Sequence, residues 1–203
     1  MLGIFAFNMQ GVQGGIYQML NHGISTGGLF LIVGMIYERR HTRMIADFGG
    51  LSKVMPIFAT FFMIITLSSV ALPGTNGFVG EFLILMGAFK NNVVYGTLAT
   101  TGVILGAVYM LWMFQRVMFG VVTKEENRNL KDLDGREILI LTCMVFFIIL
   151  MGVYPKMFFK KMDTSVTEYL AFVKQKSAQA RVLEGNTVPA KMAREVTNTN
   201  MTR

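Results

Sequence analysis

Hydrophobic residues along this chain are gathered into four long blocks that short polar segments separate. The blocks cover residues 11–37, 56–89, 93–119 and 138–154. Each block is long enough to reach across a bilayer as a helix, because about 17–25 apolar residues span the hydrocarbon core. The blocks show no strict two-residue alternation, so helices are the structure that satisfies their backbone in lipid. The pattern predicts an all-α integral membrane protein with several transmembrane helices.

The block at residues 56–89 is too long for one span. As a straight helix its 34 residues would measure about 51 Å. Its middle contains Pro73, Gly74 and Gly77, which favour a break. The block therefore predicts one discontinuous helix. Such breaks lie at membrane depth where the backbone is packed in protein or lines a watery cavity, and in transporters they commonly mark ion sites. The alternative is a surface loop between two short interfacial helices.

The pattern divides the chain into three parts. Residues 1–155 carry the apolar blocks and form the predicted transmembrane domain. Residues 156–174 are predicted to form an amphipathic helix lying on the membrane or on a neighbouring subunit, since apolar side chains recur there at helical spacing, at Val166, Tyr169, Leu170 and Val173. Residues 175–203 are polar and are expected to form a mobile tail.

Composition agrees with lipid as the solvent. Charged residues make up only 15% of the chain, against about 25% in an average soluble domain. The formal net charge is +7, but the basic residues lie in the loops and the tail and are not interleaved with exposed aromatic residues on one domain. Lipid, and not nucleic acid, is therefore the expected partner.

The sequence lacks the motifs of a redox or metal site. Its single cysteine, Cys143, excludes a disulfide within the chain and an iron–sulfur cluster or multi-cysteine metal site built by this chain alone. It contains no dinucleotide fingerprint, Walker loop, metal-ligand cluster or nucleophile triad. We expect no cofactor in this chain.

Glu81 is an ionisable residue inside a predicted span, which makes it a candidate functional group because a charge there is costly. It follows the predicted break by four residues and falls in about the first turn of the half-helix that restarts there. The positive end of that half-helix favours a carboxylate, which could accept and release protons. The alternative is a protonated glutamate bonded to a backbone group at the break.

His22 is the second candidate and lies near the middle of the first block. We expect it to be buried, and its unperturbed pKa lies near physiological pH, as a proton relay requires. Asn21, Ser25 and Thr26 lie within hydrogen-bonding range of it along the helix, and Tyr17 and Gln18 lie about one turn earlier. Together these side chains could order water into a proton path. A histidine that only forms a packing hydrogen bond on a glycine-rich helix is the alternative.

Several short strings of sequence carry a family resemblance. They are Asn21-His-Gly-Ile-Ser-Thr-Gly-Gly-Leu-Phe30, Tyr37-Glu-Arg-Arg-His-Thr-Arg43, Gly49-Gly-Leu-Ser52 and Leu72-Pro-Gly-Thr-Asn-Gly-Phe-Val-Gly-Glu-Phe82. Together they resemble the C-terminal part of the subunit M, or chain 4, family of proton-translocating NADH–quinone oxidoreductase, respiratory complex I. The resemblance covers about residues 1 to 155. Members of this antiporter-like family have 14 transmembrane helices in two inverted repeats with flanking helices, and on that pattern the chain begins within the tenth.

The resemblance implies a role for each candidate. Glu81 matches the family's acidic residue at the outlet of the proton path, and His22 matches its histidine in the central hydrophilic axis. Pro73, Gly74 and Gly77 would belong to the discontinuous twelfth helix. The family's paired glutamate and lysines of the first repeat have no counterpart in this sequence.

The function that the resemblance implies is that of a membrane-arm subunit. It would form part of a proton-translocating half-channel and couple quinone reduction to proton pumping, as one subunit of a translocase without a redox site of its own. NADH, FMN, iron–sulfur clusters and quinone are expected in partner subunits, with antiporter-like neighbours beside this chain. A component of a sodium/proton antiporter and a purely structural membrane-arm module remain alternatives. The expected location is an energy-coupling membrane, with the bacterial plasma membrane ahead of the mitochondrial inner or thylakoid membrane.

Overall fold

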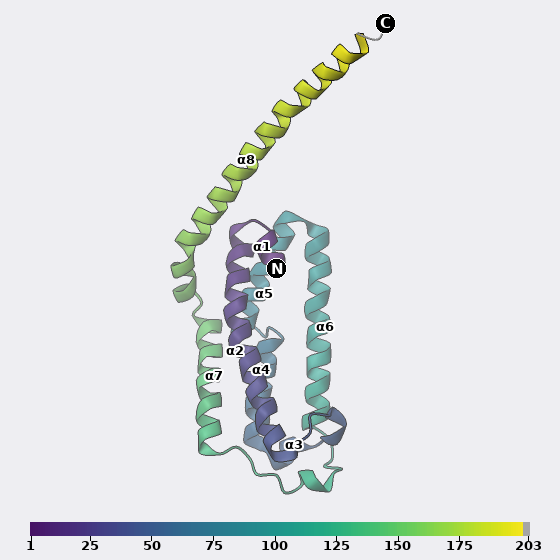
Figure 1. The fold of residues 1–203 in the computed structure, drawn as a ribbon. Coiled ribbons are helices and arrows are strands. Elements are labelled where there is room, and N and C mark those ends of the chain that lie inside the picture. The colour runs from purple at the N-terminus through teal and green to yellow at the C-terminus, as the bar shows by residue number, and fades with distance from the viewer. Residues whose placement is uncertain (201–203) are drawn as a thin grey trace. The chain divides into compact units, whose positions relative to one another are not determined.

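Helices are the regular secondary structure of the described part of the chain (Figure 1). The computed structural model describes the backbone of residues 1–200 and the side chains of residues 1–180. The elements are α1 (Leu2–Phe5), α2 (Met9–Arg40), the 3-10 turn η1 (Ile45–Asp47), α3 (Leu51–Val54), α4 (Pro56–Ser69), α5 (Asn76–Asn91), α6 (Val93–Met118), η2 (Glu125–Asn127), α7 (Gly135–Val153) and α8 (Lys156–Asn200). Two compact units, residues 1–162 and 163–203, are described separately.

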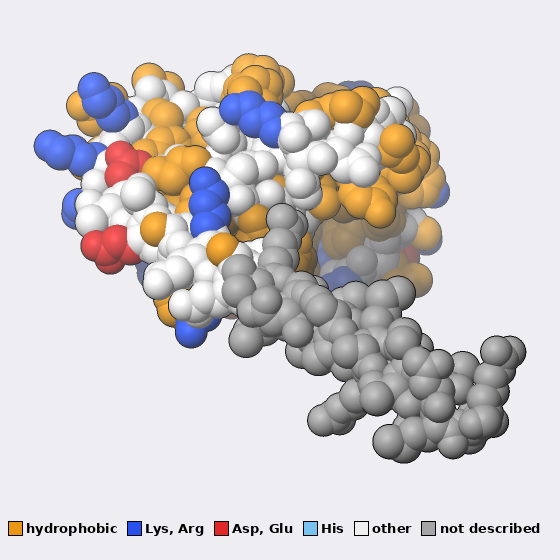
Figure 2. Space-filling view, turned by 90° about the horizontal axis from the view of Figure 1, so that it is seen from above, with side chains coloured by type: hydrophobic (Ala, Val, Ile, Leu, Met, Phe, Trp, Pro, Cys, Tyr) orange, Lys and Arg blue, Asp and Glu red, His pale blue; other side chains and the backbone are white. Residues whose placement is uncertain are grey.

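Three of the described helices are long and apolar enough to cross a membrane. They are α2, α6 and α7, with 32, 26 and 19 residues, and α4 is a shorter apolar helix. Large apolar side chains on α6, such as Leu98 and Leu105, are exposed by more than 60% of their surface. Hydrophobic side chains also reach the surface over much of the face in Figure 2. The prediction of an all-α membrane protein with several spans is confirmed.

The block at residues 56–89 is interrupted at the predicted place. α4 ends at Ser69 and α5 begins at Asn76, and the two follow one another along α2 (Figure 1). Between them the chain takes left-handed backbone conformations at Ala71 (φ 58°) and Gly74 (φ 93°), which end a right-handed helix. Thr75 and Asn76 are buried at the restart, with 9% and 0% of their surface exposed. The prediction of a discontinuous helix is confirmed.

Close packing of α2 against α5 determines where the break lies along α2. Asn8 caps the start of α2 by accepting from Gly11 N at 2.8 Å, and its Nδ2 donates to the carbonyl oxygen of Gly87 on α5 at 2.8 Å. A Cβ atom at Gly87 would come within 2.6 Å of Gly11 N. Only glycine permits this backbone approach.

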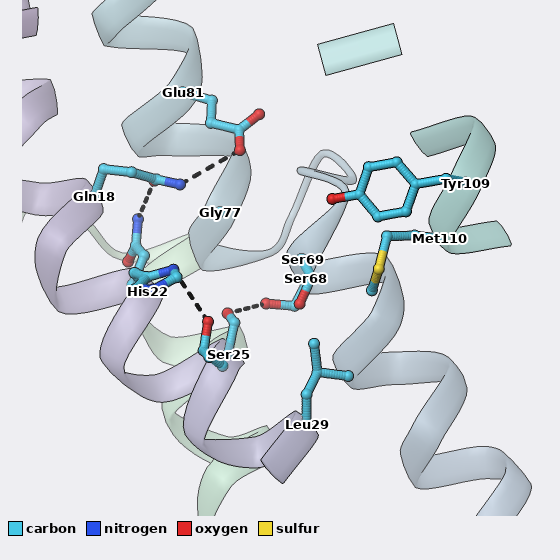
Figure 3. Close-up of a pocket in the computed structure, with 12 residues that line it drawn as sticks. Gln18, His22, Ser25, Leu29, Ser68, Ser69, Gly77, Glu81, Tyr109 and Met110 are labelled. Carbon is cyan, nitrogen blue, oxygen red and sulfur yellow. Dashed lines mark hydrogen bonds between the residues drawn. The ribbon is translucent and has the colours of Figure 1, made fainter. Parts of the chain in front are cut away.

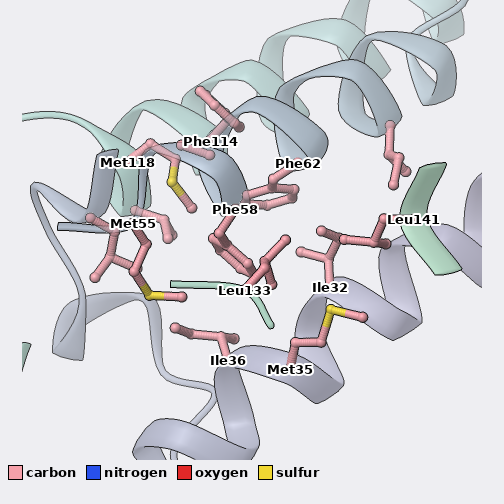
Figure 4. Close-up of a cluster of buried hydrophobic side chains, with 14 of the residues drawn as sticks. Ile32, Met35, Ile36, Met55, Phe58, Phe62, Phe114, Met118, Leu133 and Leu141 are labelled. Atoms are coloured by element: carbon pink, nitrogen blue, oxygen red, sulfur yellow. The ribbon is translucent and has the colours of Figure 1, made fainter. Parts of the chain in front are cut away.

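An apolar core holds the opposite ends of these helices together (Figure 4). It contains buried side chains from α2, α4, α6 and α7, including Ile32, Phe58, Phe62, Phe114 and Leu141. The ring centroids of Phe62 and Phe114 lie 5.2 Å apart, an ordinary separation for packed aromatic rings. This core fixes α4, the first half of the broken helix, between α2 and α6.

The segment before α7 also anchors α4. Both carboxylate oxygens of Asp132 accept from the first N–H groups of α4, from Ile57 N at 2.9 Å and Phe58 N at 3.0 Å. These N–H groups have no partner within a helix, and a carboxylate there also meets the positive helix end. Asp132 therefore caps α4, which lacks a capping side chain of its own at Met55.

The last helix is longer than the sequence pattern indicated. The predicted amphipathic helix covers residues 156–174, whereas α8 continues to Asn200. Residues 175–184 contain glutamine, lysine, alanine, arginine, leucine and glutamate, which are favourable in helices even without an apolar face, whereas Gly185 and Pro189 are unfavourable in a helix interior. The mobility expected of residues 175–203 stays a prediction. The last three residues of the predicted tail, 201–203, lie outside the described residues.

Candidate functional site

The candidate site lies where the helix break meets the middle of α2. Glu81 is the sixth residue of α5, so it stands in the second turn and not in the first, as the sequence predicted. The difference arises because α5 begins at Asn76, one residue before Gly77, from which the turn was counted. Since the helix dipole acts mainly within the first turn, it gives Glu81 less support than expected.

Two cavities meet at Glu81. The first has a volume of about 220 Å³ and lies between α2 and the break, where its lining includes Gln18, His22, Ser25 and Glu81. The second, of about 300 Å³, lies between the break and α6. Each has room for several water molecules. Four residues line both cavities: Ser69, Glu81, Tyr109 and Met110.

Hydrogen bonds tie Glu81 to α2 (Figure 3). Nε2 of Gln18 donates to Oε1 of Glu81 at 3.4 Å. Nδ2 of Asn21 donates to Oε1 of Gln18 at 3.2 Å and to the backbone oxygen of Asn76 at 2.7 Å. A line of amide groups thus joins the restart of the broken helix to the carboxyl group.

A second cluster of polar side chains lies next to these amide groups and is buried. The hydroxyl oxygens of Ser25 and Ser68 are 2.7 Å apart, and Ser68 donates to Oδ1 of Asn76 at 2.6 Å. Ser25 belongs to α2, Ser68 to α4 and Asn76 to α5, so the three side chains join both halves of the broken helix to α2. Hydrogen bonds among buried polar groups favour one arrangement of the helices, although Nδ2 of Asn76 has no partner among the described residues.

His22 lines the first cavity together with Glu81. Its Nδ1 lies 3.0 Å from the hydroxyl oxygen of Thr26, which confirms that Thr26 is within hydrogen-bonding range. The expected burial of His22 is wrong for the described residues, because its side chain is exposed. The reason is that no described helix covers this side of α2, where a Cβ atom added at Gly23 would meet nothing within 4 Å.

Tyr17 lies apart from the candidate group. It is fully buried, and its hydroxyl donates to the backbone oxygen of Met151 on α7 at 2.6 Å. Its ring packs against Phe158 and Phe159 at centroid distances of 5.9 and 4.8 Å. Tyr17 is not among the residues that line either cavity, so the structure does not join it to His22 and Glu81.

Some of the other predicted residues line the first cavity, and others line neither cavity. Ser25, Thr26 and Gly77 line the first cavity. Pro73 and Gly74 belong to the exposed tip of the break and line neither cavity. They act on the site by ending α4.

Sequence reasoning placed Gln18 and Asn21 beside His22 in the predicted proton path but did not pair Gln18 with Glu81. It missed Ser68, Asn76 and Tyr109 as residues of the site. Gln18, Asn21 and Ser25 recur at intervals of three and four residues, which is the signal of one polar helix face, but this signal does not say which residue of another helix the face meets. Tyr109 stands alone in an apolar block, where nothing in the sequence distinguishes it.

The arrangement holds groups that can exchange protons beside space for water. It combines one carboxyl group, one imidazole and several hydroxyl and amide groups around space for water, which are the components of a proton relay in a membrane. Among the described residues there is no cluster of three or more histidine, cysteine, aspartate or glutamate side chains placed to hold a metal ion.

Comparison with known proteins gives concordant matches. The model of the NADH:quinone oxidoreductase/Mrp antiporter transmembrane family matches residues 1–108. NADH-quinone oxidoreductase subunit M of Rhodobacter capsulatus is 51% identical over 156 residues, which are 77% of this chain and 30% of that protein. NADH-ubiquinone oxidoreductase chain 4 of Marchantia polymorpha is 47% identical over 166 residues, which are 82% of this chain and 34% of that protein.

Solved structures are similar as well. Respiratory complex I from Thermus thermophilus with bound NADH contains a chain that superposes with a TM-score of 0.78 at 36% identity, over 84% of this chain and 36% of that chain. The membrane-bound sulfane sulfur reductase, an archaeal respiratory membrane complex, gives a TM-score of 0.67 at 26% identity, over 72% of this chain and 24% of that chain.

The chain spans about a third of the length of the curated relatives it matches. The family model nevertheless covers more than half of the chain, including α2, the helix break and α5. The chain belongs to the NADH:quinone oxidoreductase/Mrp antiporter family of membrane proteins.

Proposed function

We propose that this chain forms part of a proton-translocating half-channel in the membrane arm of an NADH–quinone oxidoreductase. Its relatives named subunit M and chain 4 of that enzyme support the proposal, as does its likeness to a chain of complex I. The channel would couple quinone reduction in partner subunits to proton pumping through this one.

The observation that carries the proposal is the position of Glu81 between two cavities. A carboxyl group that reaches both cavities is able to take a proton from water in one and release it to water in the other. His22 lines only the first cavity, so it would pass protons to or from Glu81 on that side. Ser25 and Thr26 would order the water between them.

Partners and location follow from the same proposal. NADH, FMN, iron–sulfur clusters and quinone would be bound by partner subunits, and antiporter-like subunits would lie beside this chain in the membrane arm. The energy-coupling membrane would be the plasma membrane of a bacterium, in line with the similarity to Rhodobacter and Rickettsia proteins. The similarity to Marchantia and Arabidopsis proteins keeps a mitochondrial inner membrane as the second choice.

The test is the Glu81→Gln variant in the native complex, reconstituted into vesicles. It should assemble normally but pump fewer protons per NADH oxidised, because glutamine keeps the shape of the side chain and carries no exchangeable acidic proton. The control is Glu125→Gln, which removes a carboxylate from a loop where 76% of the side chain is exposed, and it should leave pumping unchanged.

The outcomes separate the alternatives. Normal pumping by Glu81→Gln would exclude the proton role and favour a structural module. Sodium-dependent proton exchange in vesicles that contain the chain and its membrane partners, without NADH or quinone, would instead identify a sodium/proton antiporter.

A further inference from the structure

Gln18 lies beside the carboxyl group of Glu81, which faces two cavities. Its Nε2 is 3.4 Å from Oε1 of Glu81, a long hydrogen bond. Gln18 lines only the first of the two cavities, whereas Glu81 lines both. A bond to Gln18 therefore holds the carboxyl group toward the first cavity.

Hydrogen bonds that begin at the helix break determine which end of the Gln18 amide faces Glu81. The backbone oxygen of Asn76 accepts hydrogen bonds and never donates them, so Asn21 must turn its NH2 group toward it, at 2.7 Å. The same NH2 group faces Gln18, which must present its oxygen there, at 3.2 Å. The remaining end of the Gln18 amide, its NH2 group, is thereby directed at Glu81.

Gly80 shows how tightly the Gln18 amide is seated. A Cβ atom at position 80 would overlap Oε1 of Gln18 and lie 2.9 Å from Nδ2 of Asn21. The amide therefore lies directly over the backbone of α5, one residue before Glu81. Any side chain at position 80 would push the amide away from the carboxyl group.

We propose that Gln18 is a positioning residue, a latch that holds the ionised Glu81 carboxylate toward the first cavity and releases it when the carboxyl group is protonated. The proposal rests on the proton role proposed for Glu81. An ionised carboxylate only accepts hydrogen bonds and binds an N–H donor strongly, whereas a protonated carboxyl group is a weaker acceptor. Proton uptake thus frees the group to turn toward the second cavity. Besides Glu81, the titratable side chains that line the two cavities are His22 and Tyr109.

The latch is tested with two variants that disrupt the same bond by different routes. Gln18→Leu removes the amide, and Gly80→Ala leaves it present but displaced. Both should lower the rate of proton pumping by the assembled complex about tenfold, which corresponds to the loss of one hydrogen bond to a charged group. Adding Gly80→Ala to Gln18→Ala should lower pumping less than Gly80→Ala does in the unaltered chain, because the Gln18 amide is gone and only the contacts of the new Cβ atom with Nδ2 of Asn21 and with the Cβ atom at position 18 remain.

A spectroscopic readout separates positioning from a merely structural role. Infrared difference spectra of the complex between high and low pH should contain a carboxyl C=O band that Glu81→Gln removes. That band should change its frequency in Gln18→Leu and Gly80→Ala. The matched control is Gly27→Ala on α2, where an added Cβ atom meets nothing within 4 Å, and it should keep both the band and the pumping rate.

Each result decides a different point. If Glu81→Gln abolishes pumping while Gln18→Leu and Gly80→Ala pump normally, the latch is refuted and the proton role of Glu81 stands. Lower pumping with an unchanged carboxyl band would also refute the latch, because Gln18 would then be acting without touching Glu81. Normal pumping by Glu81→Gln would overturn the proposed function itself.

Discussion

Arg39 and Glu137 form a two-point ion pair that joins the end of α2 to the start of α7. Two guanidinium nitrogens of Arg39 donate to the two carboxylate oxygens of Glu137, at 2.8 and 2.6 Å. Arg39 also donates to the backbone oxygens of Met35, Lys131 and Asp132. Because Asp132 caps α4, this pair fixes the segment that holds the first half of the broken helix.

We expect Arg39→Met to destabilise the folded chain by about 3 kcal/mol. The variant leaves the Glu137 carboxylate, with only 6% of its side chain exposed, without its charged partner, and breaking a buried pair on one side carries a cost of this order. Thermal or denaturant unfolding of the purified complex, followed by release of this chain, measures the loss.

The control for this pair is Arg128→Met. Arg128 lies 3.3 Å from Glu125, but 59% and 76% of the two side chains are exposed, and exposed pairs contribute little. It should unfold like the unaltered chain. Equal stability of Arg39→Met and Arg128→Met would show that the α2–α7 connection does not depend on the ion pair.

How much of this fold the sequence predicts depends on the kind of signal. The spans and the break follow from the lengths of the apolar blocks and from Pro73 and Gly74, because lipid and backbone geometry act on local sequence. The meeting of Ser25, Ser68 and Asn76 depends on how three helices pack, which no local pattern encodes.

Two adjacent residues on α2 also show what a local sequence pattern does not predict. Tyr17 and Gln18 are neighbours in sequence, yet Tyr17 faces α7 and Gln18 faces the first cavity. Each residue advances about 100° around a helix. Tyr17 therefore lies about 140° from His22, five residues on, and does not share its helix face. Gln18, four residues before His22, is the neighbour on that face.

Gly152 offers a test of how closely α7 must approach the helix break. A Cβ atom at Gly152 would overlap the backbone oxygen of Gly74, and backbone atoms do not move aside as flexible side chains do. We expect Gly152→Ala to shift the break and to destabilise the chain by about 1–3 kcal/mol, as overpacking does. Proton pumping per NADH oxidised should also fall, since the break positions α5 and Glu81.

The same helix supplies the control for that variant. Gly135, at the start of α7, has nothing within 4 Å of an added Cβ atom. Gly135→Ala should therefore keep both stability and pumping. If Gly152→Ala pumped and unfolded like Gly135→Ala, the approach of α7 to Gly74 would have no bearing on the site.

Tyr17→Phe should separate stability from proton movement. The variant removes the hydroxyl that donates to Met151 O at 2.6 Å and leaves a buried carbonyl oxygen without this partner, at a cost of about 1–3 kcal/mol. Because Tyr17 lines neither cavity, each assembled complex should pump at the unaltered rate. The comparison is His22→Asn, which alters the first cavity and should lower pumping with little change in stability, since the side chain is exposed. A pumping defect in Tyr17→Phe that exceeds its loss of assembled complex would return Tyr17 to the proton path and contradict the division that the structure makes on α2.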